Sequence, residues 1–161
     1  MKVQNTMKIK IIFLMGFLLW GQLGIAQDYQ SSLGGRLGTY TAVSYTKYLG
    51  ESNAVEAIAG ITRAANQSNY TFGGYYKLHF GVSTNIPTLS YYFGLGALIN
   101  LEKEGEGRTT YLAPSALTGM EYSLEHAPVN FFLDFSTYYQ KNLDSTLDLH
   151  ANLGVRYILS R

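Results

Sequence analysis

Residues 147–159 read LDLHANLGVRYIL, and the alternation in this stretch decides the fold class. Every odd position carries an apolar residue, whereas Asp148, His150, Asn152 and Arg156 occupy even positions. Successive side chains of a β-strand point to opposite faces, so this period of two predicts a strand with one apolar and one polar face.

The same period recurs along most of the chain. Further alternating stretches cover residues 54–63, 70–80, 89–102, 110–124 and 129–140. The stretch at 89–102, LSYYFGLGALINLE, is longer than the roughly 3–10 residues of a strand in a soluble protein. The N-terminal region reads either as two strands, 31–38 and 41–49, or as one long kinked strand. Bacterial outer-membrane barrels have an even strand number, which favours two strands and a total of eight.

The segments between these strands predict an antiparallel meander. They are rich in glycine, asparagine, serine, proline and charged residues, as turns require, and are too short to contain a crossover helix. Pro114 interrupts the pattern because it cannot donate a hydrogen bond to a neighbouring strand. We therefore expect a β-bulge near that rim of the barrel.

The first 26 residues predict a secretory signal peptide rather than part of the fold. Three lysines precede an apolar run at 11–20, and small residues lead to a cleavage site after Ala26. Ten apolar residues are fewer than the ~20 that span a bilayer as a helix. The predicted mature domain is therefore a single barrel over residues 27–161.

Composition excludes several classes of function. The chain has no cysteine, so disulfides, thiol catalysis and thiolate metal sites are ruled out. Three of its 12 lysines and arginines lie in the predicted signal peptide. The predicted mature domain therefore has nine basic and eleven acidic residues, which gives a net charge of −2. No basic face for nucleic acid is indicated. Charged residues make up only 14% of the chain, against roughly a quarter in soluble domains.

The two strand faces predict which side meets lipid. The non-apolar face is dominated by glycine, serine, threonine, asparagine and tyrosine, whereas a soluble lipocalin-like barrel would present lysine, glutamate and aspartate there. This sidedness favours a transmembrane barrel over a soluble periplasmic barrel that binds a small hydrophobic ligand. Aromatic residues are expected in two girdles at the membrane interfaces. One girdle contains Phe80, Tyr91, Phe93, Tyr122, Phe131 and Tyr157, and the other contains Tyr70, Phe72 and Tyr139.

The chain resembles the small eight-stranded outer-membrane barrels of the OmpA/OmpX type, in particular those of Bacteroidota. The resemblance rests on Leu33-Gly34-Gly35-Arg36, on Val43-Ser44-Tyr45 with residues 52–56, and on the closing strand. In that strand Asn152, Gly154, Tyr157 and Leu159 match the barrel-assembly signal. The chain departs from the pattern by ending on Leu159-Ser160-Arg161 rather than on an aromatic residue. The resemblance implies an outer-membrane location, with lipid and the barrel-assembly machinery as partners.

Charged residues on the polar face predict a lumenal network. An eight-stranded barrel is just wide enough for side chains to fill its interior, and buried charges must pair. The members of this predicted network are Arg36, Glu56, Lys77, His79, Glu121, Asp134 and Arg156. A filled lumen predicts a structural or accessory barrel that is not a general pore.

A lipid-modifying enzyme is the main alternative, of the lipid A deacylase or acyltransferase type. Such chemistry needs a serine, a base and an orienting acid, for which Ser136, His150 and Asp148 are the candidates. The sequence around His150 lacks the nearby serine typical of lipid A deacylases, so we predict no enzymatic activity. The three histidines lie on different elements, and we predict neither metal nor cofactor.

Two further hypotheses concern the surface. The apolar face fits a second membrane protein as well as lipid. Ser145, within Asp144-Ser145-Thr146, resembles an O-glycosylation acceptor of Bacteroidota.

Overall fold

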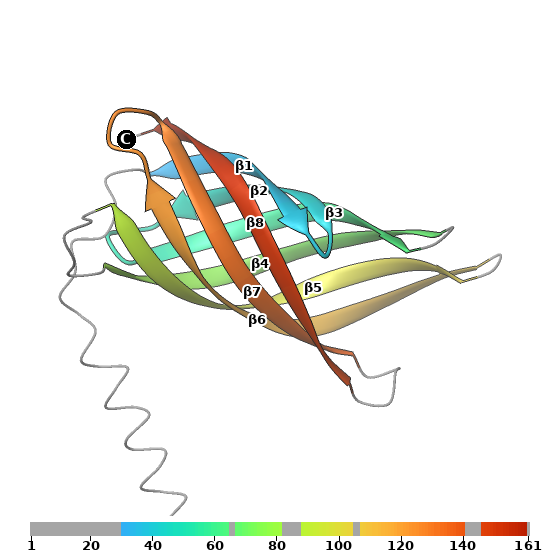
Figure 1. Cartoon of the computed structure of the whole chain (residues 1–161). Coiled ribbons are helices and arrows are strands. Elements are labelled where there is room, and N and C mark those ends of the chain that lie inside the picture. Colours follow the sequence, from blue (N-terminus) through green and yellow to red (C-terminus); the bar gives the residue numbers. More distant parts are fainter. Residues whose placement is uncertain (1–29, 65–66, 82–87, 105–106, 141–145, 161) are drawn as a thin grey trace, which may run out of the picture.

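The computed structural model describes residues 30–64, 67–81, 88–104, 107–140 and 146–160. The predicted signal peptide and Ser145 lie outside these ranges. Eight strands form a closed barrel in chain order, and every neighbouring pair, including β1 with β8, is antiparallel (Figure 1). The strands are β1 (Ser31–Gly38), β2 (Thr41–Tyr48), β3 (Asn53–Ala64), β4 (Gln67–Gly81), β5 (Leu89–Glu104), β6 (Gly107–Ser123), β7 (Val129–Gln140) and β8 (Thr146–Ser160).

The predicted eight-stranded antiparallel barrel is confirmed. The N-terminal region forms two strands, with Thr39 and Tyr40 between them. Predicted boundaries agree within three residues, and the largest differences lie where β4 begins and β6 begins. Among the described residues no helix is long and apolar enough to cross a membrane.

The bulge predicted at Pro114 is wrong. The β5–β6 register runs without a shift through the pair Ala97–Pro114. Pairing between β6 and β7 begins only at Ser115 with Tyr138, so Pro114 lies beyond the part of β6 that pairs with β7. Its missing N–H is therefore tolerated without an extra residue. The register does shift elsewhere, between Ser31 and Ser32 where β1 meets β8.

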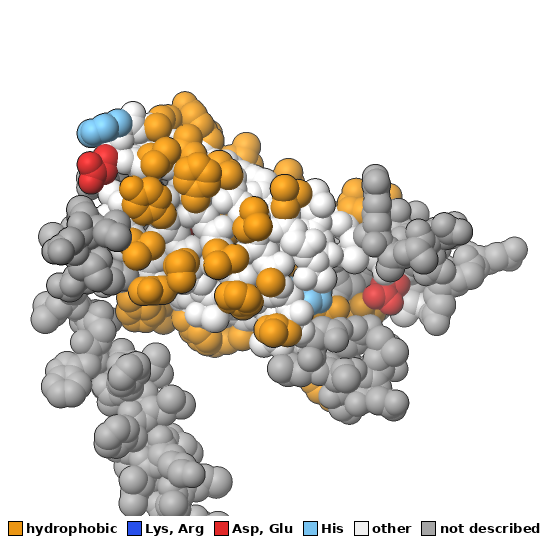
Figure 2. Space-filling view, in the orientation of Figure 1, with side chains coloured by type: hydrophobic (Ala, Val, Ile, Leu, Met, Phe, Trp, Pro, Cys, Tyr) orange, Lys and Arg blue, Asp and Glu red, His pale blue; other side chains and the backbone are white. Residues whose placement is uncertain are grey.

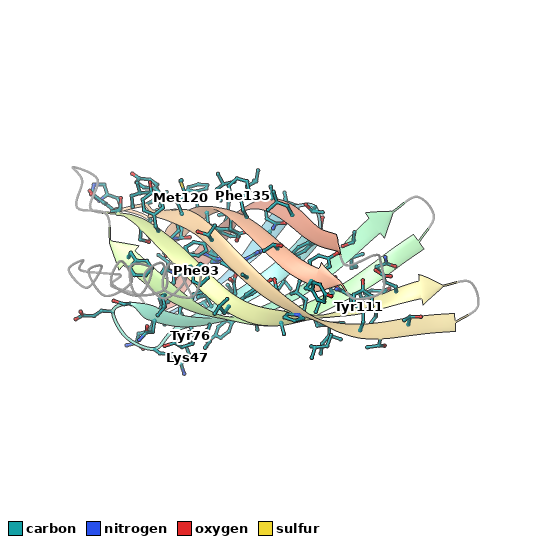
Figure 3. The ribbon with its side chains drawn as sticks, turned by 90° about the horizontal axis from the view of Figure 1, so that it is seen from below. Lys47, Tyr76, Phe93, Tyr111, Met120 and Phe135 are labelled. Carbon is teal, nitrogen blue, oxygen red and sulfur yellow. The ribbon has the colours of Figure 1, made fainter. Side chains whose placement is uncertain are left out.

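Apolar side chains cover the outside of the barrel. Figure 2 shows them spread over the body of the barrel, and Tyr76, Phe93, Met120 and Phe135 project outwards in Figure 3. The residues predicted for the two girdles are outward and exposed, except for Phe80, which is half-buried. Of the strand residues with described side chains, Lys47 is the charged one on the outward face. It lies near the terminal rim, defined here as the end that holds Gln30 and the end of β8.

Two apolar clusters fill parts of the lumen. Tyr48, Ala54 and Ile158 pack together near the terminal rim. A larger cluster lies farther along the barrel, and we call it the apolar layer. Its buried members are Tyr40, Ala42, Ile58, Tyr75, Tyr92, Leu98 and Leu117. This layer was not predicted, because Ile58, Leu98 and Leu117 are apolar residues at lumenal positions.

Candidate functional site: a charge network across the lumen

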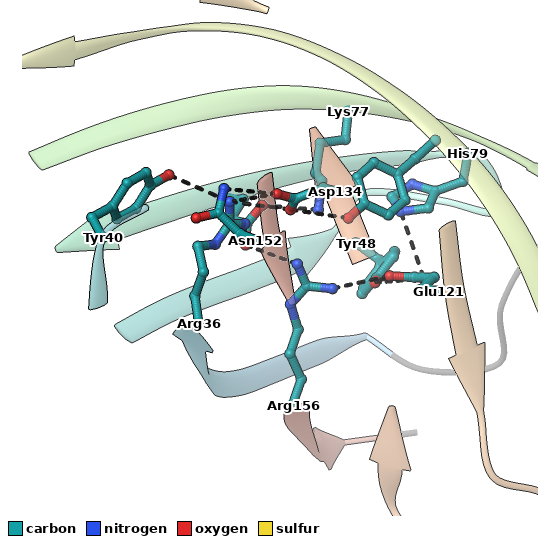
Figure 4. Close-up of polar contacts among 11 residues, drawn as sticks. Arg36, Tyr40, Tyr48, Lys77, His79, Glu121, Asp134, Asn152 and Arg156 are labelled. Carbon is teal, nitrogen blue, oxygen red and sulfur yellow. Dashed lines mark hydrogen bonds and ion pairs between the residues drawn. The ribbon is translucent and has the colours of Figure 1, made fainter. Parts of the chain in front are cut away.

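All seven residues of the predicted network lie inside the barrel, and each is at most 2% exposed. Six strands contribute to the set, which contains three carboxylates, two arginines, one lysine and one histidine. Because strand parity directs these positions inwards, charges far apart in sequence face one another inside the barrel (Figure 4).

Glu56 on β3 is the centre of the network. Its Oε1 accepts hydrogen bonds from Nη2 of Arg36 at 3.0 Å and from Nη2 of Arg156 at 2.9 Å. Its Oε2 lies 2.8 Å from Nζ of Lys77. One carboxylate thus joins cations from β1, β4 and β8, which ties opposite parts of the barrel wall together.

Asp134 on β7 is the second carboxylate. Its Oδ2 lies 3.1 Å from Nη1 of Arg36 and accepts a hydrogen bond from the Tyr92 hydroxyl at 3.2 Å. Its Oδ1 accepts a hydrogen bond from Nδ2 of Asn152 at 3.2 Å. Arg36 therefore bridges Glu56 and Asp134.

Glu121 on β6 is the third carboxylate. It lies 3.0 Å from Nη1 of Arg156 and accepts a hydrogen bond from the Tyr48 hydroxyl at 3.2 Å. Nε2 of His79 lies 3.6 Å from the same carboxylate. The His79 ring is flanked by the rings of Tyr48 and Tyr92, with centroids 5.2 and 5.4 Å away. Arg156 therefore bridges Glu56 and Glu121, and the three carboxylates form one continuous chain of ion pairs.

Aromatic rings support the cations. The guanidinium carbon of Arg156 lies 3.8 Å from the centroid of the Phe132 ring, and that of Arg36 lies 5.2 Å from it. Nζ of Lys77 lies 4.1 Å from the centroid of the Tyr92 ring. These cation–π contacts compensate part of the cost of removing the charges from water.

Gly154 makes room for this arrangement. A Cβ atom at this position would collide with the ring of Phe132 and with the backbone oxygen of Gly35. The absence of a side chain lets Phe132 lie against β8, beneath both guanidinium groups. Gly154 thus has a packing role besides its place in the predicted assembly signal.

The four residues of the predicted assembly signal divide between the two faces of β8. Asn152 and Gly154 point into the lumen, whereas Tyr157 and Leu159 point outwards and are 55% and 52% exposed. An outward aromatic and an outward apolar residue at the end of the closing strand are accessible to another protein.

The candidate enzyme residues do not form a catalytic arrangement in the part that is described. Ser136 and His150 are register partners on β7 and β8. Ser136 is 2% exposed, and its Oγ has no hydrogen-bond partner among the described residues, so it is not bonded to His150. The His150 ring instead lies edge-on to Tyr138, with centroids 4.9 Å apart. The side chain of Asp148 is not among those that the structure describes.

No metal site is visible among the described residues, where no three acidic, histidine or cysteine side chains gather as ligands. His79 lies in the charge network, His126 is exposed in the turn after β6, and His150 lies in the lumen near Tyr138.

Four aromatic residues of the site were not assigned to it from sequence. Tyr40, Tyr48 and Tyr92 donate or accept hydrogen bonds within the network, and Phe132 is the ring beneath the two arginines. Phe132 lies between Asn130 and Asp134 on the lumenal face of β7. An aromatic ring among inward polar residues is the sequence signal that could have revealed it.

Two solved structures are similar to this chain in fold but share little of its sequence. The N-terminal β-barrel domain of Pseudomonas aeruginosa OprF superposes with a TM-score of 0.63 at 14% identity, covering 79% of this chain and 93% of that domain. Neisserial surface protein A superposes with a TM-score of 0.55 at 15% identity, covering 80% of this chain and 93% of that protein's chain. Neither a protein-family model nor a curated protein sequence matches the chain. At these identities the likeness concerns the fold alone.

Proposed function

We propose that this chain is a structural barrel of the bacterial outer membrane, with a lumen closed by its charge network and without enzymatic activity. One observation carries the proposal: apolar side chains face outwards, whereas Arg36, Lys77 and Arg156 are 0% exposed inside. A soluble barrel would reverse this arrangement, because water solvates charges and not an apolar exterior.

The contents of the lumen support a closed barrel. The ion pairs connect strands across the interior, and the apolar layer and the cluster of Tyr48, Ala54 and Ile158 fill further parts of the lumen. An ion passing through would have to separate buried pairs, which is costly when a charge is left without its partner. In this proposal the barrel holds its shape by cross-linking its own wall and does not conduct.

The finer assignments are part of the same proposal. The assembly machinery recognises the outward residues Tyr157 and Leu159, and the terminal rim faces the periplasm. The OmpX-type and Bacteroidota assignments are supported by the sequence motifs in β1, β2 and β8. Lipid modification is not proposed, because Ser136 lies buried in the lumen rather than against lipid.

Membrane fractionation with a heat-modifiability gel tests the location. We expect the protein in the outer-membrane fraction, migrating faster unheated than boiled, because a closed barrel resists detergent until it is heated. A soluble periplasmic protein with a single gel position would overturn the proposal.

A further inference from the structure

The β1–β2 hairpin is much shorter than its neighbours and leaves a notch in the barrel wall. Pairing of β1 with β8 stops at Gly38 with Asn152, although β8 begins at Thr146. Pairing of β2 with β3 stops at Thr41 with Ile61, although β3 continues to Ala64. Figure 1 shows β3, β4, β5 and β6 extending well beyond this hairpin.

Three cavities meet at the notch. An outer groove of about 680 Å³ and a notch cavity of about 410 Å³ share Thr41 and Ile61. The notch cavity and a lumenal vestibule of about 110 Å³ share Thr39 and Tyr40. Through these shared residues the three cavities are continuous. They lead from the outward face of the barrel, past the β1–β2 turn, into the lumen.

The groove is suited to a hydrocarbon chain. Gly35, which has no side chain, and Ala59 line it on either side of Val43, while Phe72 on β4 and Leu153 on β8 line its two edges. Gly35 points outwards and has no atom within 4 Å of the position of a Cβ. A larger side chain at position 35 would therefore extend into the groove and fill part of it.

The vestibule is suited to an uncharged polar head. Asn100 is 6% exposed; its Oδ1 accepts a hydrogen bond from Oγ1 of Thr71 at 2.7 Å, but its Nδ2 has no partner among the described residues. Oδ1 of Asn69 also has no partner there. Buried polar atoms are normally hydrogen-bonded, so a donor and an acceptor are left for a ligand.

The charge of the vestibule determines whether a charged or an uncharged head group binds there. Its described lining contains no lysine or arginine but does contain Glu102, which accepts a hydrogen bond from the Tyr111 hydroxyl. A phosphate or carboxylate head would meet the like charge of Glu102, and among the described lining side chains only His150 can become cationic. Hydroxyl groups, which both donate and accept, complement Asn100 and Asn69.

We propose that the groove, notch and vestibule form one binding site for a single-chain amphiphile with an uncharged, hydroxylated head, such as a monoacylglycerol. The chain lies in the groove, the head enters the vestibule through the notch, and Tyr40 lies where the two meet. The inference rests on the proposed membrane location, because the amphiphile arrives from the surrounding lipid.

Photocrosslinking in phosphatidylcholine nanodiscs tests the site. The probe is monooleoylglycerol with a diazirine in its chain, and the control is the same chain on lysophosphatidate. We expect wild-type crosslinks concentrated on the groove residues of β1–β4 and β8 and a clear preference for the uncharged probe. Equal labelling of the whole exterior or equal labelling by both probes would overturn the proposal. Crosslinks between two copies of the protein across this face would also overturn it.

Two glycine variants separate the site from general lipid contact. Gly35→Leu fills the groove and should reduce crosslinking about tenfold, the scale of inserting methylenes into an occupied site. Gly74→Leu is the matched control, since Gly74 also points outwards but does not line the groove. Equal yields from both variants would contradict the site. Because reconstituted, heat-modifiable barrel is used, this result is independent of where the protein is found in cells.

Discussion

Replacing Glu56 by alanine is expected to destabilise the folded barrel by about 3–5 kcal/mol, the usual cost of removing one partner from a buried ion pair. The substitution leaves Arg36, Lys77 and Arg156 without their shared carboxylate in a water-poor interior. Urea unfolding in lipid vesicles, followed by the heat-modifiable gel shift, measures the change. We expect the unfolding midpoint to fall clearly below that of the wild type.

Two further variants make this prediction specific. Glu56→Gln keeps an oxygen acceptor for the guanidinium groups and removes the charge, so its stability should lie between those of wild type and Glu56→Ala. Glu51→Ala changes an exposed carboxylate in the turn before β3 and should stay within about 0.5 kcal/mol of wild type. A Glu56→Ala barrel as stable as the Glu51→Ala barrel would show that the network does not hold the structure.

Replacing Leu153 by arginine is expected to cost about 2–4 kcal/mol in a bilayer, as for a charge on the lipid face near the midplane of a barrel. Leu153 is 59% exposed and lies midway along the outward apolar residues of β8, between Leu149 and Leu159. Unfolding in vesicles measures the cost.

Leu49→Arg is the matched control for depth. Leu49 is 58% exposed but follows the end of β2 at the terminal rim, where an arginine should cost only about 0–1 kcal/mol. Equal stability of the two arginine variants would indicate that Leu153 faces water, as it would in the lipocalin-like alternative.

The strands could be predicted from sequence because a period of two records the surroundings of each face. Residues 129–140 alternate between apolar and polar positions, and they form β7 with the same bounds. The lipid face demands apolar residues, so alternation is strict there and the outward positions are easily recognised.

The detailed packing of the lumen could not be predicted in the same way. The inside of a narrow barrel is a protein core, in which apolar residues such as Leu98 and Leu117 are as acceptable as polar ones. Which inward residues meet also depends on strand stagger across the barrel, and this stagger is not contained in any single strand. The position of Phe132 beneath Arg36 and Arg156 is a consequence of that stagger.

The short β1–β2 hairpin illustrates a second limit. Turn residues at 39–40 were predicted, but the resulting notch depends on how far β3 and β8 extend on either side. The groove depends on Gly35 and Ala59 lying near each other across β2, which only the register shows.

Ion conductance across a planar lipid bilayer tests the closed barrel most directly. Purified, folded wild-type protein should insert without producing stepwise currents above the bare-membrane baseline, because paired charges and the apolar layer fill its lumen. Insertion is verified separately by recovery of heat-modifiable protein with the lipid. Discrete, reproducible conductance steps from the wild-type barrel would contradict the account.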